Sequence, residues 1–163
     1  MIRLIPFHKK NIKIFFSLSF LILLSCSQDL NKSNFYDLPF SNQTIFEDEI
    51  DFSSFENNNI LLNFWFPSCP PCVYELEILD RINSKSSATK VIGVQVLGLD
   101  TKEDGKKMFL NKGISYPSVA DEKDKVVSTL DITVFPTTIL FDKNGKEFKL
   151  SLIHISEPTR LAT

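Results

Sequence analysis

Two cysteines, Cys69 and Cys72, stand three positions apart in the stretch FPSCPPCVYE, with two prolines between them. Such a pair could bind a metal, form a structural disulfide or exchange thiols reversibly. A structural zinc site needs about four ligands, usually from two such pairs or from Cys and His together. The chain offers one pair, and its histidines, His8 and His154, lie close to the two ends. The sequence therefore argues against a metal site.

The two remaining interpretations differ in their physical basis. A disulfide across two residues closes a very small loop and would restrain little of the unfolded chain, which weakens a purely structural role. If a strand leads into a helix here, Cys69 lies at the helix N-terminus, where unpaired N–H groups and the helix dipole favour a thiolate. Cys72 then lies one turn further along and can resolve a mixed disulfide. Pro70 and Pro71 fit the first turn, where a missing N–H costs little.

The flanking sequence predicts this strand and this helix. The run ILLNFWF, residues 60–66, is apolar apart from Asn63 and is typical of a strand buried on both faces. Ser68 is expected to cap a helix over residues 69–82. The apolar stripe of that helix is predicted to be Val73, Leu76, Leu79 and Ile82.

The downstream sequence predicts further strands and helices in alternation. Residues 90–99 form a second apolar run, and a helix is expected to start at Asp100, with Glu103 in capping-box position. Gly113 is the expected left-handed end of that helix. Residues 137–142 predict a third core strand, followed by a turn and a hairpin partner. The order predicts an α/β domain with a central mixed sheet flanked by helices.

Shorter elements are expected around this framework. Residues 35–40 and 44–50 are interpreted as short edge strands. A helical turn is expected near residues 51–59, and a short helix over residues 122–130.

The segment NFWFPSCPPCVYE resembles the active site of thioredoxin-like proteins. It is most similar to the TlpA/ResA class of membrane-anchored bacterial thiol–disulfide oxidoreductases. The resemblance extends over about residues 35–149 and implies a thioredoxin-like fold that ends in a helix, which this chain lacks if its last residues are non-native. It also implies that Cys69 is the attacking thiol, Cys72 the resolving thiol and Glu75 a proton acceptor for the resolving thiol.

The motif VFPTT, residues 134–138, matches a second hallmark of these folds. The resemblance implies a cis peptide bond before Pro136, which would face the cysteines. It further implies that Phe135 offers its backbone to an incoming peptide or protein disulfide.

Three positions near the cysteines support or modify the resemblance. Ser68 stands where the family usually has Trp, which changes the surface around the first cysteine. Trp65 occupies the other aromatic position and is expected to pack beneath the site. Asn63 replaces the buried Asp of cytoplasmic thioredoxins, and because an amide cannot take a proton, the role of base moves to Glu75 or water.

The N-terminal sequence predicts export and lipidation. A basic stretch precedes the apolar run at residues 14–24, which is shorter than the roughly 20 residues of a membrane span and is typical of a signal peptide. The junction LLSC resembles a bacterial lipobox ending at Cys26. We therefore interpret residues 1–25 as a lipoprotein signal peptide and residues 26–34 as a lipidated cysteine with a polar tether.

The C-terminal sequence departs from the rest of the chain. The stretch SLIHISEPTR resembles a translated sequencing adapter. We interpret residues 150–163 as a non-native tail, so that the thioredoxin-like domain covers residues 35–149.

The function that these observations favour is reduction of protein disulfides in the bacterial cell envelope. The domain would face the periplasm or exterior, anchored by lipid, with a membrane electron donor upstream and cytochrome c maturation as one role. No cofactor or metal is implied, and a net charge of −2 gives no sign of nucleic-acid binding. Two alternatives remain, a binding lipoprotein with an inert disulfide and a redoxin-type peroxidase. The second lacks the P-x-x-x-T-x-x-C pattern of that group.

Overall fold

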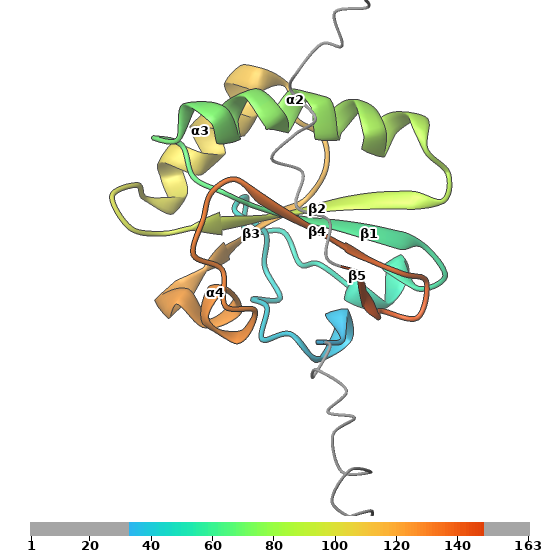
Figure 1. The fold of residues 1–163 in the computed structure, drawn as a ribbon. Coiled ribbons are helices and arrows are strands. Elements are labelled where there is room, and N and C mark those ends of the chain that lie inside the picture. Colours follow the sequence, from blue (N-terminus) through green and yellow to red (C-terminus); the bar gives the residue numbers. More distant parts are fainter. Residues whose placement is uncertain (1–32, 149–163) are drawn as a thin grey trace, which may run out of the picture. The chain divides into compact units, whose positions relative to one another are not determined.

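A mixed sheet forms the centre of residues 33–148, the part of the chain that the computed structural model describes (Figure 1). The strand order is β3-β2-β1-β4-β5. The pairs β1–β2 and β2–β3 are parallel, whereas β1–β4 and β4–β5 are antiparallel. The strands are β1 Asn59–Trp65, β2 Thr89–Val96, β3 Ser118–Asp121, β4 Thr137–Phe141 and β5 Glu147–Phe148. This confirms the mixed sheet predicted from the sequence.

Helices cover both faces of the sheet, as expected. Figure 1 shows α2 and α3 on one face and α4 on the other. The α-helices are α2 Pro70–Lys85, α3 Lys102–Lys112 and α4 Lys125–Thr129. Short 3₁₀ helices are η1 Phe35–Asp37, η2 Phe52–Phe55 and η3 Glu122–Asp124.

Strand β1 divides the core into two parts because successive side chains of a strand point to opposite faces. Ile60, Leu62 and Phe64 join the hydrophobic cluster that includes η1 and α4 residues. Leu61 and Trp65 join the cluster formed with α2 and α3. Asn63 lies two residues from both Leu61 and Trp65, so its side chain lies on the same face of the sheet, the one that α2 covers.

The buried stripe of α2 differs from the prediction at its end. Leu76 and Leu79 are buried as expected, but Ile82 is 37% exposed. The following residue, Asn83, instead faces the sheet, and its Oδ1 accepts a hydrogen bond from the Val91 N–H at 3.0 Å. The helix thus ends on a polar contact with β2.

Helix α3 begins one residue later than predicted. Its N-cap is Thr101, and a reciprocal capping box joins Thr101 to Asp104, so the assignment to Asp100 and Glu103 was wrong. The shift leaves Asp100 in the loop between β2 and α3. The expected end is confirmed, because Gly113 adopts φ 64° and caps the helix in the left-handed conformation.

The N-terminal part of the domain is the main error of the sequence interpretation. Residues 35–50 were expected to form edge strands, but they contain η1 and only isolated bridges, such as Gln43 with Glu49. Phe35 is fully buried and contacts the rings of Phe40, Phe52 and Phe141. This packing of aromatic side chains outweighs the strand propensity of the segment.

The interpretations of residues 1–25, of Cys26 and of residues 150–163 lie outside the described residues. Asn34, at the end of the expected tether, bonds into the fold, since its Nδ2 donates to the Asn144 carbonyl at 3.2 Å. Across residues 33–148, no helix has the length and apolarity needed to cross a membrane.

Candidate active site

Cys69 and Cys72 form a disulfide at the start of α2, directly after the loop that follows β1. Cys72 is fully buried, whereas Cys69 keeps 6% of its surface exposed. Cys69 is therefore the less enclosed of the two residues. This asymmetry suits an attacking role for Cys69.

Cys69 itself is the N-cap of α2. Its sulfur accepts a hydrogen bond from the Cys72 N–H at 3.3 Å, and its carbonyl accepts from the Val73 N–H at 3.0 Å. Pro70 and Pro71 occupy the first two helical positions, as expected. In the reduced state, this position places the helix dipole and the Cys72 N–H, which has no backbone partner within the helix, at the Cys69 sulfur. Both favour the thiolate.

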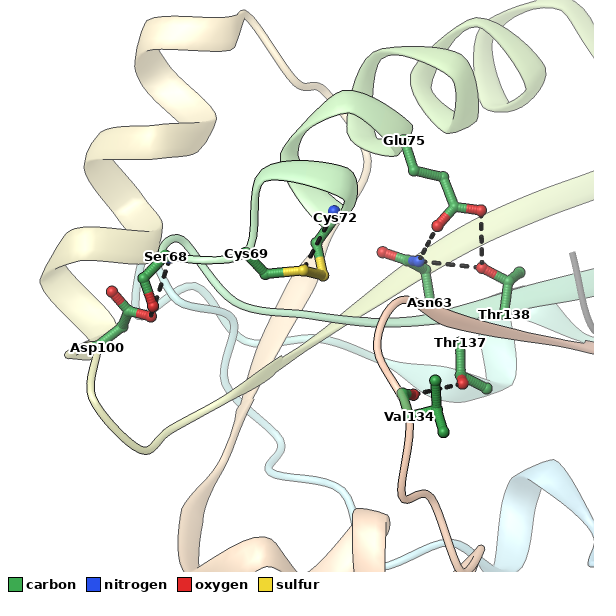
Figure 2. The surroundings of a disulfide bond; sticks show 9 residues. All are labelled: Asn63, Ser68, Cys69, Cys72, Glu75, Asp100, Val134, Thr137 and Thr138. Carbon is green, nitrogen blue, oxygen red and sulfur yellow. Dashed lines mark hydrogen bonds between the residues drawn. A yellow bond between two sulfur atoms is a disulfide. The ribbon is translucent and has the colours of Figure 1, made fainter. Parts of the chain in front are cut away.

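Ser68 is not the cap that the sequence predicted. Its N–H and its Oγ both donate to Asp100 Oδ2, at 3.0 and 2.6 Å. The side chain therefore points toward the β2–α3 loop rather than over the first turn of α2 (Figure 2). Sequence analysis missed Asp100 because the contact spans 32 residues and depends on how the two loops meet.

A polar cluster of Asn63, Glu75 and Thr138 lies on the other side of the disulfide (Figure 2). Asn63 Nδ2 donates to Glu75 Oε2 at 3.2 Å and to Thr138 Oγ1 at 3.0 Å. The Thr138 hydroxyl donates in turn to Glu75 Oε1 at 3.5 Å. Side chains of β1 and β4 thus hold the carboxylate of Glu75, which lies on α2 three residues after Cys72.

The environment of Glu75 changes its acidity. Partial burial raises the pKa of Glu75 above its ordinary value, although the hydrogen bonds from Thr138 and Asn63 act in the opposite direction. Residues three apart on a helix are neighbours, so Glu75 and Cys72 lie on the same side of α2. A raised pKa brings Glu75 nearer to the working range of a proton acceptor at neutral pH.

Asn63 is fully buried between β2 and β4 on the α2 face. Within residues 33–148 its Oδ1 has no hydrogen-bond partner, while its Nδ2 serves both Glu75 and Thr138. The amide therefore acts as a donor that orients Glu75. The assignment of the role of base to Glu75 or water stays a prediction.

Trp65 packs beneath the site. It is fully buried and stacks on Phe109 of α3 with ring centroids 4.9 Å apart. Its Nε1 donates to Ser118 Oγ at 3.1 Å. A Cβ at Gly93 would lie 2.7 Å from Ser118 Oγ and 3.1 Å from Trp65 Nε1, so this close contact requires glycine.

The Phe135–Pro136 peptide bond is cis, as the resemblance implied. Phe135 packs edge-on against Phe66, with ring centroids 5.4 Å apart, and contacts the cluster that contains both cysteines. The Thr137 hydroxyl donates to the Val134 carbonyl at 2.6 Å, which closes the loop before β4 (Figure 2). The cis bond implied by the resemblance is thus confirmed, and the position of Pro136 facing the cysteines stays a prediction.

The chemical groups gathered here are two sulfurs, two carboxylates, an amide and hydroxyls. Within residues 33–148, His, Cys, Asp and Glu side chains form no group of three or more that could hold a metal ion. The arrangement is suited to moving a proton near a reactive thiol.

The chain is similar to known thiol–disulfide proteins. It is 31% identical over 101 residues to the thiol-disulfide oxidoreductase ResA of Bacillus anthracis, covering 60% of this chain and 57% of that relative. The chain therefore spans little more than half the length of this curated relative.

Solved structures with the same architecture confirm the thioredoxin-like fold. An exposed lipoprotein thioredoxin from Streptococcus pneumoniae matches with a TM-score of 0.57 and 25% identity, covering 68% of this chain and 85% of that one. A secreted disulfide oxidoreductase from Mycobacterium tuberculosis matches in fold with a TM-score of 0.60 and 17% identity, covering 74% and 84%. The model of the redoxin family matches residues 42–159. Since that match covers more than half of the chain, this protein belongs to the redoxin family.

Proposed function

We propose that this protein is a thiol–disulfide oxidoreductase that reduces disulfides of other proteins through Cys69 and Cys72. The observation that carries the proposal is the position of Cys69, which caps α2 with its sulfur on the Cys72 N–H and keeps part of its surface exposed. A disulfide with a purely structural role requires neither of these features. The similarity to relatives named thiol-disulfide oxidoreductase ResA supports the same conclusion.

The reaction begins from the reduced pair. The Cys69 thiolate attacks one sulfur of the partner disulfide, a Cys69–partner bond forms, and the second partner sulfur leaves as a thiolate. Cys72 gives its proton to Glu75 and attacks the Cys69 sulfur, which releases the first partner sulfur as a thiolate. The partner gains two electrons and takes two protons from Glu75 and solvent, while Cys69 and Cys72 return to the disulfide.

A second dithiol must then reduce Cys69–Cys72. We propose that a membrane electron donor supplies the two electrons and two protons by the same exchange, run in the opposite direction. Suitable substrates are protein disulfides outside the cytoplasmic membrane, such as oxidised haem-attachment cysteines of apocytochrome c.

We further propose that lipid on Cys26 anchors the domain to the cell envelope. The lipobox-like junction LLSC and the similarity to an exposed lipoprotein thioredoxin support this placement. Metabolic labelling with a radioactive fatty acid should mark the wild-type chain and leave a Cys26→Ala variant unlabelled. Equal labelling of both chains would contradict lipid attachment at this residue.

Trapping of the mixed disulfide tests the exchange reaction. The full chain with Cys72→Ser cannot resolve the intermediate, so non-reducing gels of envelope extracts should show adducts that dithiothreitol releases. The matched control is a Cys69→Ser/Cys72→Ser double variant, which should form none. If the two variants gave the same bands, or neither gave any, Cys69 would not be the attacking thiol.

A further inference from the structure

We infer that Asp100 is a positioning residue that lowers the thiolate population of Cys69 and thereby makes the Cys69–Cys72 pair a stronger reductant. The inference rests on the proposed exchange function and assigns a residue that shifts its redox equilibrium toward the disulfide. Asp100 lies outside the motif around the cysteines, in the separate loop between β2 and α3.

The first observation is the geometry of the contact with Ser68. One carboxylate oxygen, Asp100 Oδ2, accepts both the Ser68 N–H at 3.0 Å and the Ser68 Oγ–H at 2.6 Å. Two bonds from one residue fix the carboxylate more firmly than a single surface contact does. Because Ser68 is bonded covalently to Cys69, the contact also holds the charge beside the attacking cysteine (Figure 2).

The distance between the charge and the sulfur is bounded by the chain itself. Neighbouring Cα atoms lie about 3.8 Å apart, so the Asp100 carboxylate stays within roughly 10 Å of the Cys69 sulfur, about one Debye length at 0.1 M salt. A fixed negative charge at this range disfavours a second negative charge on the sulfur. The site is partly exposed, so the effect is a few-fold and not orders of magnitude.

The second observation is that Asp100 forms no ion pair with a Lys or Arg side chain among residues 33–148. The ion pairs found there join Lys102 to Glu47 and Lys112 to Glu77, and Asp100 takes part in neither. Lys102, two residues from Asp100, is held by Glu47 at 3.3 Å. Glu75 lies on the opposite side of the disulfide and adds a further negative group.

Two opposing influences therefore meet at Cys69. The N-terminus of α2, through the Cys72 N–H, favours the thiolate, whereas Asp100 disfavours it. Stabilising the thiolate stabilises the reduced pair and makes a protein a better oxidant. By opposing this effect, Asp100 shifts the pair toward the disulfide and makes its dithiol a better electron donor.

Ser68 links this inference to the sequence. A Trp at this position, as in the related class, would keep the N–H donor but lose the hydroxyl donor. The Ser68 hydroxyl forms the shorter of the two bonds to Asp100. Serine at position 68 therefore changes the surface around Cys69 and also holds the Asp100 carboxylate in place.

The test compares Asp100→Asn with wild type in the full chain. The amide keeps an acceptor for Ser68 but removes the charge. We expect the apparent pKa of the Cys69 thiol, measured by alkylation of the reduced protein across pH, to fall. We also expect the equilibrium with a glutathione redox buffer to shift about two- to fivefold toward the dithiol. Glu103→Gln is the matched control, since it removes an exposed carboxylate of α3 that does not contact Ser68, and it should change neither quantity.

A Ser68→Ala variant separates charge from position. It removes the shorter of the two hydrogen bonds but leaves the carboxylate and the Ser68 N–H, so both measurements should shift in the same direction as in Asp100→Asn but by less. The inference is overturned if Asp100→Asn matches wild type, or if Ser68→Ala, which keeps the carboxylate, shifts both measurements as far as Asp100→Asn does. Failure of the exchange function itself looks different, because then no variant, wild type included, would equilibrate with glutathione.

Discussion

The two sides of the disulfide use the same chemical group in opposite surroundings. On the buried side, Glu75 accepts hydrogen bonds from Asn63 and Thr138, and burial raises its pKa. On the exposed side, Asp100 accepts two bonds from Ser68 alone. The comparison teaches that burial suits one carboxylate to exchange protons, while the partly exposed carboxylate acts as a fixed charge.

The largest expected effect comes from Glu75→Gln, which keeps the shape of the buried side but removes its proton acceptor. Loss of a general base typically costs about 100-fold or more in the step it assists. We expect the resolving step, measured as decay of a mixed disulfide between Cys69 and a model peptide, to slow by about that factor at pH 7. An unchanged decay rate would show that water or another group takes the Cys72 proton.

The same variant changes the pH dependence of stability. A raised pKa means that the folded protein binds the Glu75 proton more tightly than the unfolded chain, so wild type is most stabilised while this group is protonated. Its free energy of unfolding should decline from about pH 4 toward neutrality as Glu75 ionises. Urea titrations of Glu75→Gln should lack this component. If the free energy of unfolding of Glu75→Gln varied with pH in parallel with that of wild type, ionisation of Glu75 would not destabilise the fold.

The next effect is expected at Asn63, the donor that orients Glu75. Asn63→Leu leaves Glu75 and Thr138 without this buried partner, which should cost about 2–3 kcal/mol of unfolding free energy. Asn111→Leu, on the exposed surface of α3, is the control and should change stability little. If both substitutions had equally small effects in urea titrations, the polar cluster would contribute nothing to the fold.

A smaller effect is expected at Thr138, which bonds both members of the cluster. Thr138→Val retains the shape but removes the hydroxyl, for an expected loss of about 1 kcal/mol. Thr133→Val, at an exposed position before the Phe135–Pro136 bond, should stay near wild type in the same thermal unfolding experiment. If Thr133→Val were more destabilising than Thr138→Val, the hydroxyl that matters for stability would lie outside the cluster of Asn63, Glu75 and Thr138.

The smallest effect on stability is expected on the exposed side. Ser68→Ala should cost about 0.5 kcal/mol, because water can replace the lost hydroxyl. Ser53 provides a comparison, since its N–H and Oγ bond to Asp51 in a similar exposed pair far from the cysteines in sequence. Both substitutions should be mild in urea titrations. A loss of several kcal/mol at Ser68 alone would show that its contact with Asp100 is structural.

Much of the framework was predictable because its signals are local. The apolar run before the cysteines, the prolines in the first turn of α2 and Gly113 at the end of α3 each determine structure within a few residues. The sequence therefore located β1, α2 and the cysteine pair correctly. The family resemblance also implied the cis bond before Pro136, which the structure has.

The remaining features depend on contacts between distant residues. Asp100 and Ser68 meet only after two loops fold side by side, and local rules instead assigned each of them to a helix cap. The stretch around Phe35 lost its expected strands because aromatic packing against Phe141 decides its conformation. Capping and strand signals cannot contain this information, because the partners lie tens of residues away.

Reduction of insulin disulfides by the full chain, with dithiothreitol as the electron source, tests most directly whether Cys69 and Cys72 form an exchanging pair. Wild type should accelerate the reduction well above the rate with dithiothreitol alone, and Cys69→Ser should return it to that background. If wild type gave only the background rate while its Cys69–Cys72 disulfide resisted dithiothreitol, the bond would be an inert staple. That result would contradict the exchange mechanism.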